Sequence, residues 1–118
     1  MANQAEILDA LADYATRCNA NGKLRRMLQT WSRVVHFRAL DTGDGFTAAI
    51  HNGEIVATTA GATGEPDLVV SATSEDLCDM FWGDLNPAQK YLNGEIVIRG
   101  AAEDVMRIDA MASLMWAD

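Results

Sequence analysis

The residues that could carry chemistry are few in this chain and lie far apart. His36 and His51 are the only histidines among the 118 residues, and each alternates with apolar residues on the expected outward face of a strand. Neither histidine has a cysteine or a carboxylate at the spacing of a metal site. We therefore expect two solvated strand histidines, and we expect no metal and no other cofactor.

The candidate nucleophiles and acids also lack the surroundings that catalysis requires. No serine stands in the sharp strand-to-helix turn that exposes a nucleophile, and neither cysteine has an activating neighbour. The paired acids at 75–76 and 103–104 fall at expected helix starts, where the helix dipole explains them. The glycines do not form a phosphate-binding loop. The sequence therefore predicts no catalytic residue and a protein that is not an enzyme.

Length and charge describe one domain, residues 1–118, with an acidic body. The net charge of −8 is uneven, because residues 1–38 hold six of the nine bases and residues 39–118 hold 14 of the 17 acids. An acidic body lacks the basic face that phosphates require, so we expect no nucleic-acid partner. The basic region, residues 17–38, could contact an anionic membrane or an enzyme, and a solvated surface is the other interpretation.

The cysteines and the apolar runs indicate a cellular setting. Cys18 and Cys78 lie far apart in helix-like segments, as free thiols in a reducing compartment do. Residues 1–14 carry acids where a secretory leader has a basic start. No run approaches the roughly 18 apolar residues of a membrane span. We therefore expect a cytoplasmic protein.

Apolar periodicity divides the chain into three parts. Residues 1–31 have the spacing of N-terminal helices, and residues 33–73 alternate in the manner of an antiparallel strand meander. Residues 74–118 should hold two short helices, a fifth strand and a C-terminal helix. The expected fold class is α+β, with a five-stranded, mainly antiparallel sheet covered on one face by about five helices.

Local signals place the turns and the faces within these parts. Asn52-Gly53 is the dipeptide that a tight type I′ hairpin turn prefers. In the strand after it, strict alternation would put Ile55, Ala57 and Thr59 on one face.

Two helix starts are also marked in the C-terminal part. Ser74 is expected to cap the first helix, and Asn86 the second, with Pro87 at a position where its missing N–H costs nothing.

Flexible and small apolar residues face each other across the expected sheet–helix interface. Unbranched methionines re-pack around varied apolar shapes, and small residues opposite them could leave a void for a ligand. An ordinary packed core is the alternative interpretation. The helix methionines are Met80, Met106, Met111 and Met115, and the small sheet residues are Ala39, Ala48, Ala57 and Ala72.

The segment SEDLCDMFWGDLNPAQKYLNGEIVIRG, residues 74–100, resembles the signature half of the sterol carrier protein 2 family. The shared pattern is a helix with an acidic start, a glycine, a Leu-Asn-Pro step, an aromatic residue, and an alternating strand between two glycines. The matching positions are Ser74, Asp76, Leu77, Gly83, Leu85, Asn86, Pro87, Tyr91, Gly94, Ile96, Ile98 and Gly100. The resemblance covers about residues 30–116 and is strongest over 67–111.

This resemblance implies a sheet covered by helices on one side, with an apolar tunnel between the layers. It implies that the tunnel holds a fatty acyl, sterol-like or isoprenoid lipid, and that the C-terminal helix gates it. We expect Trp116 and the methionine-rich face of that helix to form the gate. By position, the lipid-binding residues would be Phe37, Ile50, Leu77, Phe81, Tyr91, Ile96, Ile98, Met106, Met111 and Met115. The expected function is non-enzymatic binding and transport of such a lipid.

Two positions differ from the family pattern and reduce the range of ligands that we expect. Glu95 begins a strand that is usually basic, and Lys90 replaces a small residue. Both changes disfavour a coenzyme A head group, so we expect an uncharged or carboxylate lipid. The alternative function is an accessory or dimerisation subunit of an enzyme of lipid or isoprenoid metabolism, with a closed cavity. A homodimer fits either function.

Overall fold

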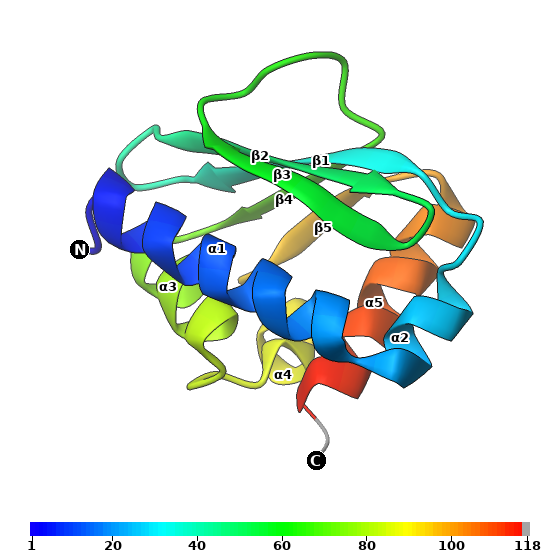
Figure 1. Cartoon of the computed structure of the whole chain (residues 1–118). Helices are drawn as coiled ribbons and strands as arrows, with labels where there is room; N and C mark the ends of the chain where they lie inside the picture. Colours follow the sequence, from blue (N-terminus) through cyan, green and yellow to red (C-terminus); the bar gives the residue numbers. More distant parts are fainter. Residues whose placement is uncertain (117–118) are drawn as a thin grey trace.

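One twisted sheet with all helices packed beneath it makes up the molecule (Figure 1). The computed structural model describes residues 1–116. The helices are α1 (Gln4–Ala20), α2 (Gly22–Met27), α3 (Ser74–Trp82), α4 (Pro87–Leu92) and α5 (Ala102–Trp116). The strands are β1 (Arg33–Ala39), β2 (Gly45–His51), β3 (Glu54–Ala60), β4 (Leu68–Ala72) and β5 (Val97–Gly100). The expected α+β class, with five strands and one helical face, is confirmed.

The strand order is β3-β2-β1-β4-β5, so the order of the strands in the sheet differs from their order in the sequence. β1, β2 and β3 form the expected antiparallel meander, but β4 leaves it and pairs in parallel with the other side of β1. β5 then pairs antiparallel with β4. The meander predicted over 33–73 is therefore wrong for its last strand, because alternation marks a strand without saying which neighbour it joins.

A β-bulge in the β2–β3 ladder reverses the expected faces of β3. Ile50 pairs with Ile55 while Ala49 pairs with Ala57, so Val56 is the extra residue. A bulge of one residue moves every later side chain to the other face. Ile55 is therefore buried against the helices, whereas Ala57 and Thr59 are exposed. The prediction that these three residues share a face is wrong.

The connection from β3 to β4, residues 61–67, crosses the sheet on the side opposite the helices (Figure 1). It is held there by Thr47, whose Oγ1 donates to the carbonyl of Gly61 at 2.7 Å. His36 lies beneath it, only 7% exposed, with Nε2 3.0 Å from the carbonyl oxygen of Thr63. The expectation that His36 is solvated is therefore wrong, because sequence alternation does not reveal a loop that covers the face. His51 is exposed, as predicted.

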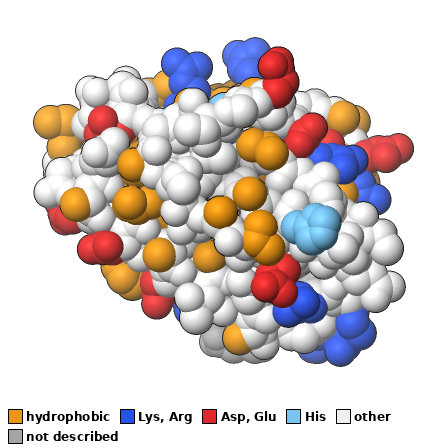
Figure 2. Space-filling model, turned by 45° about the horizontal axis from the view of Figure 1, so that its top comes forward, with side chains coloured by type: hydrophobic (Ala, Val, Ile, Leu, Met, Phe, Trp, Pro, Cys, Tyr) orange, Lys and Arg blue, Asp and Glu red, His pale blue; other side chains and the backbone are white. Residues whose placement is uncertain are grey.

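This outer side of the molecule carries hydrophobic side chains with charged side chains around them (Figure 2). The main core lies on the other side of the sheet, where Phe46, Leu68 and Val35 meet Ile7 and Leu11 of α1. The sheet therefore has one fully covered face and one partly covered face, as expected of a two-layer α+β domain.

The predicted hairpin turn is present and also contacts a helix end. Asn52 and Gly53 have φ angles of 48° and 78°, as a type I′ turn requires. A Cβ on Gly53 would lie 2.6 Å from the carbonyl oxygen of Leu28. Its N–H donates to the carbonyl of Trp31 at 3.0 Å. The turn therefore needs glycine both for its backbone angles and for its close approach to the chain after α2.

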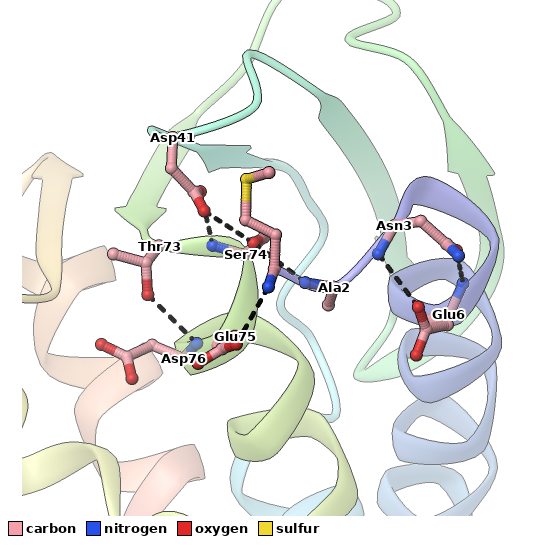
Figure 3. A network of polar contacts seen from close by, with 9 residues as sticks. Ala2, Asn3, Glu6, Asp41, Thr73, Ser74, Glu75 and Asp76 are labelled. Atoms are coloured by element: carbon pink, nitrogen blue, oxygen red, sulfur yellow. Dashed lines mark hydrogen bonds and ion pairs between the residues drawn. The ribbon is translucent and has the colours of Figure 1, made fainter.

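Ser74 joins three segments that are distant in sequence (Figure 3). Its backbone N–H and its hydroxyl each donate to the Asp41 carboxylate at 2.8 Å, and its Oγ accepts from the N–H of Ala2 at 3.2 Å. The helix cap is Thr73, one residue before the predicted position, since its side chain accepts from Asp76 N–H. Ser74 therefore connects the start of α1, the β1–β2 turn and α3.

The helices vary in length from six to 17 residues. None of the helices in the described residues is both long and apolar enough to cross a lipid bilayer.

Candidate functional site

An apolar pocket lies between the sheet and the helices, at the side of the sheet formed by β1, β4 and β5. Its volume, measured as the space that the centre of a water molecule can reach, is about 60 Å³. That is room for a few water molecules and less than a lipid chain needs. The lining residues are Tyr14, Phe37, Val70, Met80, Phe81, Asn86, Pro87, Ala88, Tyr91, Ile96, Ile98, Ile108, Asp109, Met111, Ala112 and Ser113.

Three aromatic rings form one wall of this pocket. Phe81 of α3 meets Phe37 of β1 edge to face, with ring centroids 5.0 Å apart. On its other side Phe81 contacts the ring of Tyr14 of α1, with a centroid separation of 5.6 Å. Such contacts hold large rings in fixed orientations, so this wall is rigid. Burial raises the pKa of Tyr14 well above its ordinary value, which keeps its phenol neutral.

The opposite wall comes from the short helix α4 and the second half of α5. These elements supply Tyr91 and Met111 among others, and no residue of α4 is buried. Met111 can change shape at low cost, and α4 has no buried side chain to hold it in place. This wall is therefore the part of the pocket most able to move.

Six of the ten residues assigned to the ligand from the sequence line this pocket: Phe37, Phe81, Tyr91, Ile96, Ile98 and Met111. Met115 lines a small recess that shares Tyr14, Met80, Pro87 and Ala112 with the pocket. Ile50 and Leu77 are buried in the core and do not line either space. Met106 is 71% exposed and lies in an open groove on the other side of α5.

The lining residues that were not predicted come from helix and strand faces and from the pocket mouth. Tyr14, Val70 and Ile108 are apolar positions at regular helix or strand spacing, so periodicity could have found them once the layers were known. Asn86, Asp109 and Ser113 are exposed polar residues at the mouth. Asn86 belongs to the Leu-Asn-Pro step of the family pattern, whereas no local pattern distinguishes Asp109 and Ser113 from other surface residues.

Two bases adjoin this region and are already paired with acids: Arg17 lines the recess, and Lys90 precedes the lining residue Tyr91 in α4. Lys90 lies 3.2 Å from Glu95 and 3.6 Å from Asp76, and the hydrogen bond that its ammonium group donates to Glu95 is the main reason that its pKa is raised. Arg17, beside the recess, pairs with Asp13 at 2.8 Å and donates to the carbonyl of Phe81. The two residues that differ from the family pattern, Lys90 and Glu95, therefore form an ion pair with each other.

Helix α5 is anchored at its start by a buried carboxylate. Asp104 is 6% exposed and accepts from Trp31 Nε1 and from Arg33 Nε, each at 2.9 Å. The hydrogen bond from Arg33 is the largest cause of the lowered pKa of this carboxyl group. The pocket is lined by α5 only from Ile108 onward. The helix is thus tied down at one end and forms the pocket wall at the other.

The potential metal ligands and the two thiols of the described residues are the remaining groups that could carry chemistry. Residues 1–116 contain no group of three potential metal ligands. The thiol of Cys18 is buried, which raises its pKa to about 12, and burial also raises the pKa of Cys78. A thiol with a raised pKa is a poor nucleophile. What the site offers is an apolar space with a polar mouth.

The fold and the pocket define a class of protein: an α+β domain that holds an apolar cavity between one sheet and its helices. The model of the SCP-2 sterol transfer family matches residues 11–113, so the chain belongs to that family. No curated protein matches the sequence.

Several solved structures share this fold at low sequence identity. A crystal structure of sterol carrier protein 2 has a TM-score of 0.67 and 13% identity, over 92% of this chain and 94% of that chain. The UbiJ-SCP2 ubiquinone synthesis protein has a TM-score of 0.67 and 14% identity, with the same coverage. Palmitated SCP2L2 from Aedes aegypti has a TM-score of 0.64 and 14% identity, over 91% of each chain.

Proposed function

We propose that this protein binds one apolar lipid between its sheet and its helices and carries it without chemical change. The observation that carries the proposal is the pocket itself, because its walls are apolar on all sides except the mouth. The interior of a folded protein is normally close-packed and leaves no such empty space. Where an apolar cavity is present, it usually accommodates a ligand. Membership in the SCP-2 sterol transfer family supports the same function.

A lipid chain requires more space than the observed pocket, so the mobile wall must open. We expect α5 to swing about its anchor at Asp104, since the pocket-lining half of the helix lies beyond that point. The gate role assigned to Trp116 from the sequence concerns a side chain outside the described residues. Truncation after residue 103 removes the helix and should abolish lipid uptake. Normal uptake by a truncated, folded protein would show that α5 is not the gate.

The first test is native mass spectrometry of freshly purified protein, followed by solvent extraction of the bound material. A carrier should show an added mass that disappears on extraction and is recovered as a lipid. If the protein is empty and also fails to take up fluorescent fatty acids or alcohols, the carrier function is wrong.

A matched pair of variants on α5 tests whether the lipid binds in this pocket. Ala112→Trp fills the pocket, because Ala112 lines it, whereas Ala110→Trp adds the same side chain to the open groove on the other side of the helix. We expect lipid affinity to fall at least ~10-fold in the first variant, which corresponds to about 1.4 kcal/mol, and to stay unchanged in the second. Equal affinities in both variants would place the lipid elsewhere.

The second candidate function is an accessory or dimerisation subunit of an enzyme of lipid or isoprenoid metabolism. The structural likeness to a ubiquinone synthesis protein supports it, as does Trp82, which is 45% exposed at the end of α3. Large exposed aromatic residues are enriched at protein interfaces. A partner enzyme that co-purifies with a lipid-free protein would favour this function.

Part of the basic region is engaged within the fold. Arg17, Arg25 and Arg33 pair with Asp13, Glu54 and Asp104, respectively. Lys23, Arg26 and Arg38 remain exposed and would make any contact with an anionic membrane or an enzyme. The free cysteines Cys18 and Cys78 support a cytoplasmic setting.

A further inference from the structure

The mouth of the pocket carries charge of only one sign. Among the described residues that line the pocket, Asp109 is the only one with a charged side chain. It is exposed at the rim together with the polar side chains of Asn86 and Ser113. No base lies within 4.0 Å of the Asp109 carboxylate in residues 1–116. A lipid head group at the mouth would therefore face an unpaired negative charge.

The nearby cations are not free to receive an anionic head group. Lys90 is held by Glu95 and Asp76, and Arg17 is held by Asp13 and by the carbonyl of Phe81. A carboxylate or phosphate at the mouth could pair with Lys90 or Arg17 only in competition with these acids. It would also lie beside Asp109, where the two negative charges repel each other.

We propose that the pocket selects lipids whose head group is a neutral hydrogen-bond donor, such as a long-chain or isoprenoid alcohol, through Asp109 with Asn86 and Ser113 at its mouth. This selectivity rests on the lipid-binding function proposed above. The alcohol O–H donates to the Asp109 carboxylate, a charge-assisted hydrogen bond of the stronger kind. The Asn86 amide and the Ser113 hydroxyl can donate to the alcohol oxygen in turn. Fatty acids and acyl phosphates are disfavoured.

The test compares two ligands of equal chain length, 1-hexadecanol and palmitate. Each displaces a pyrene-labelled fatty alcohol from the full chain at pH 7.5, below the critical micelle concentration of palmitate. We expect the dissociation constant of hexadecanol to be lower than that of palmitate by about 10-fold, since both chains bury the same apolar surface and only the head groups differ.

Three variants separate the role of Asp109 from the acidity of the whole protein. Asp109→Asn should weaken the binding of hexadecanol a few-fold and strengthen the binding of palmitate, so that the ratio of the two dissociation constants approaches one. Asp109→Lys should make palmitate the tighter ligand. Glu65→Gln removes the same charge from the loop on the opposite side of the sheet, where Glu65 is exposed, and should leave the ratio unchanged.

The outcomes distinguish this selectivity from lipid binding itself. If wild-type protein binds palmitate as tightly as hexadecanol, or if the ratio is the same in wild type and Asp109→Asn, head-group selection by Asp109 is wrong while lipid binding stands. If the labelled alcohol and both competitors fail to bind, the carrier function fails as well.

Discussion

Single side chains connect distant parts of this fold, and Ser74 is the clearest case. It is fully buried, and its hydroxyl both donates to Asp41 and accepts from the N–H of Ala2 (Figure 3). Its substitution by alanine would leave a buried N–H without a partner and would remove one hydrogen bond to a carboxylate. A buried N–H group without a hydrogen-bond acceptor lowers the stability of the folded protein, because it has lost its hydrogen bond to water.

We therefore expect Ser74→Ala to lower the free energy of unfolding by about 1–3 kcal/mol, measured by urea denaturation. Ser71→Ala on the outer side of the sheet is the control, and its effect should stay within about 0.5 kcal/mol. If the two variants are equally stable, the Ser74 network contributes little to stability.

At the scale of elements, the β2–β3 turn depends on glycine for two separable reasons. Gly53 has a positive φ and also lies against the carbonyl of Leu28, whereas Gly43 has a similar φ of 80° in open space. Alanine at either position carries the backbone cost, roughly 1–2 kcal/mol. Only alanine at Gly53 adds a collision with the end of α2.

Gly53→Ala should therefore destabilise the protein by at least ~1 kcal/mol more than Gly43→Ala, in the same denaturation experiment. Equal losses would mean that the hairpin can move away from α2 without cost.

The anchor of α5 makes a second prediction at this scale. Asp104→Ala removes the acceptor of both Trp31 and Arg33, and should lower stability by about 2 kcal/mol. Amide hydrogen exchange should accelerate over α5 more than over α1, because only α5 loses its attachment. Glu103→Ala is the control, since Glu103 is an exposed acid in the same first turn. Uniform acceleration in the Asp104 variant would show that the residue supports the whole fold and not α5 alone.

At the scale of the whole molecule, the shifted pKa values predict a bounded range of maximal stability. The folded pKa values of Asp41 and Asp104 are lowered from 3.8 by hydrogen bonds from Ser74 and Arg33. The contribution of these two carboxylates to the free energy of unfolding is complete above pH 3.8. It disappears as the pH falls through their lower folded pKa values. The folded pKa of Cys18 is raised from 9.0 to about 12, so its contribution is complete below pH 9 and is lost as the pH rises toward 12.

We therefore expect the melting temperature to be nearly constant between about pH 5 and pH 8 and to fall on both sides. Cys18→Ala should flatten the alkaline side, and Asp104→Asn should flatten the acid side. Thermal denaturation followed by circular dichroism, extended to pH values below and above this range, measures both effects. A melting temperature that keeps rising above pH 9 would contradict the assignment to Cys18.

Features that depend on neighbours along the chain could be predicted from the sequence. Asn52-Gly53 form the predicted turn, and Asn86 with Pro87 begins α4 as predicted. Apolar periodicity was enough for the helices, the strands and the α+β class, because each of these patterns is set within a few residues. The motif of residues 74–100 was also sufficient to indicate the family, which the match over residues 11–113 confirms.

Features that depend on contacts between distant segments could be seen only in the folded structure. One bulge turned Ala57 to the outside, a loop buried His36, and the orientation of α5 left Met106 exposed while placing Asp109 at the pocket mouth. A single polar residue on a helix carries no local signal of what will face it across space. Its neighbours are chosen by the packing of whole layers, so the polarity of the mouth, and with it the selectivity proposed for the ligand, emerges only when the chain is folded.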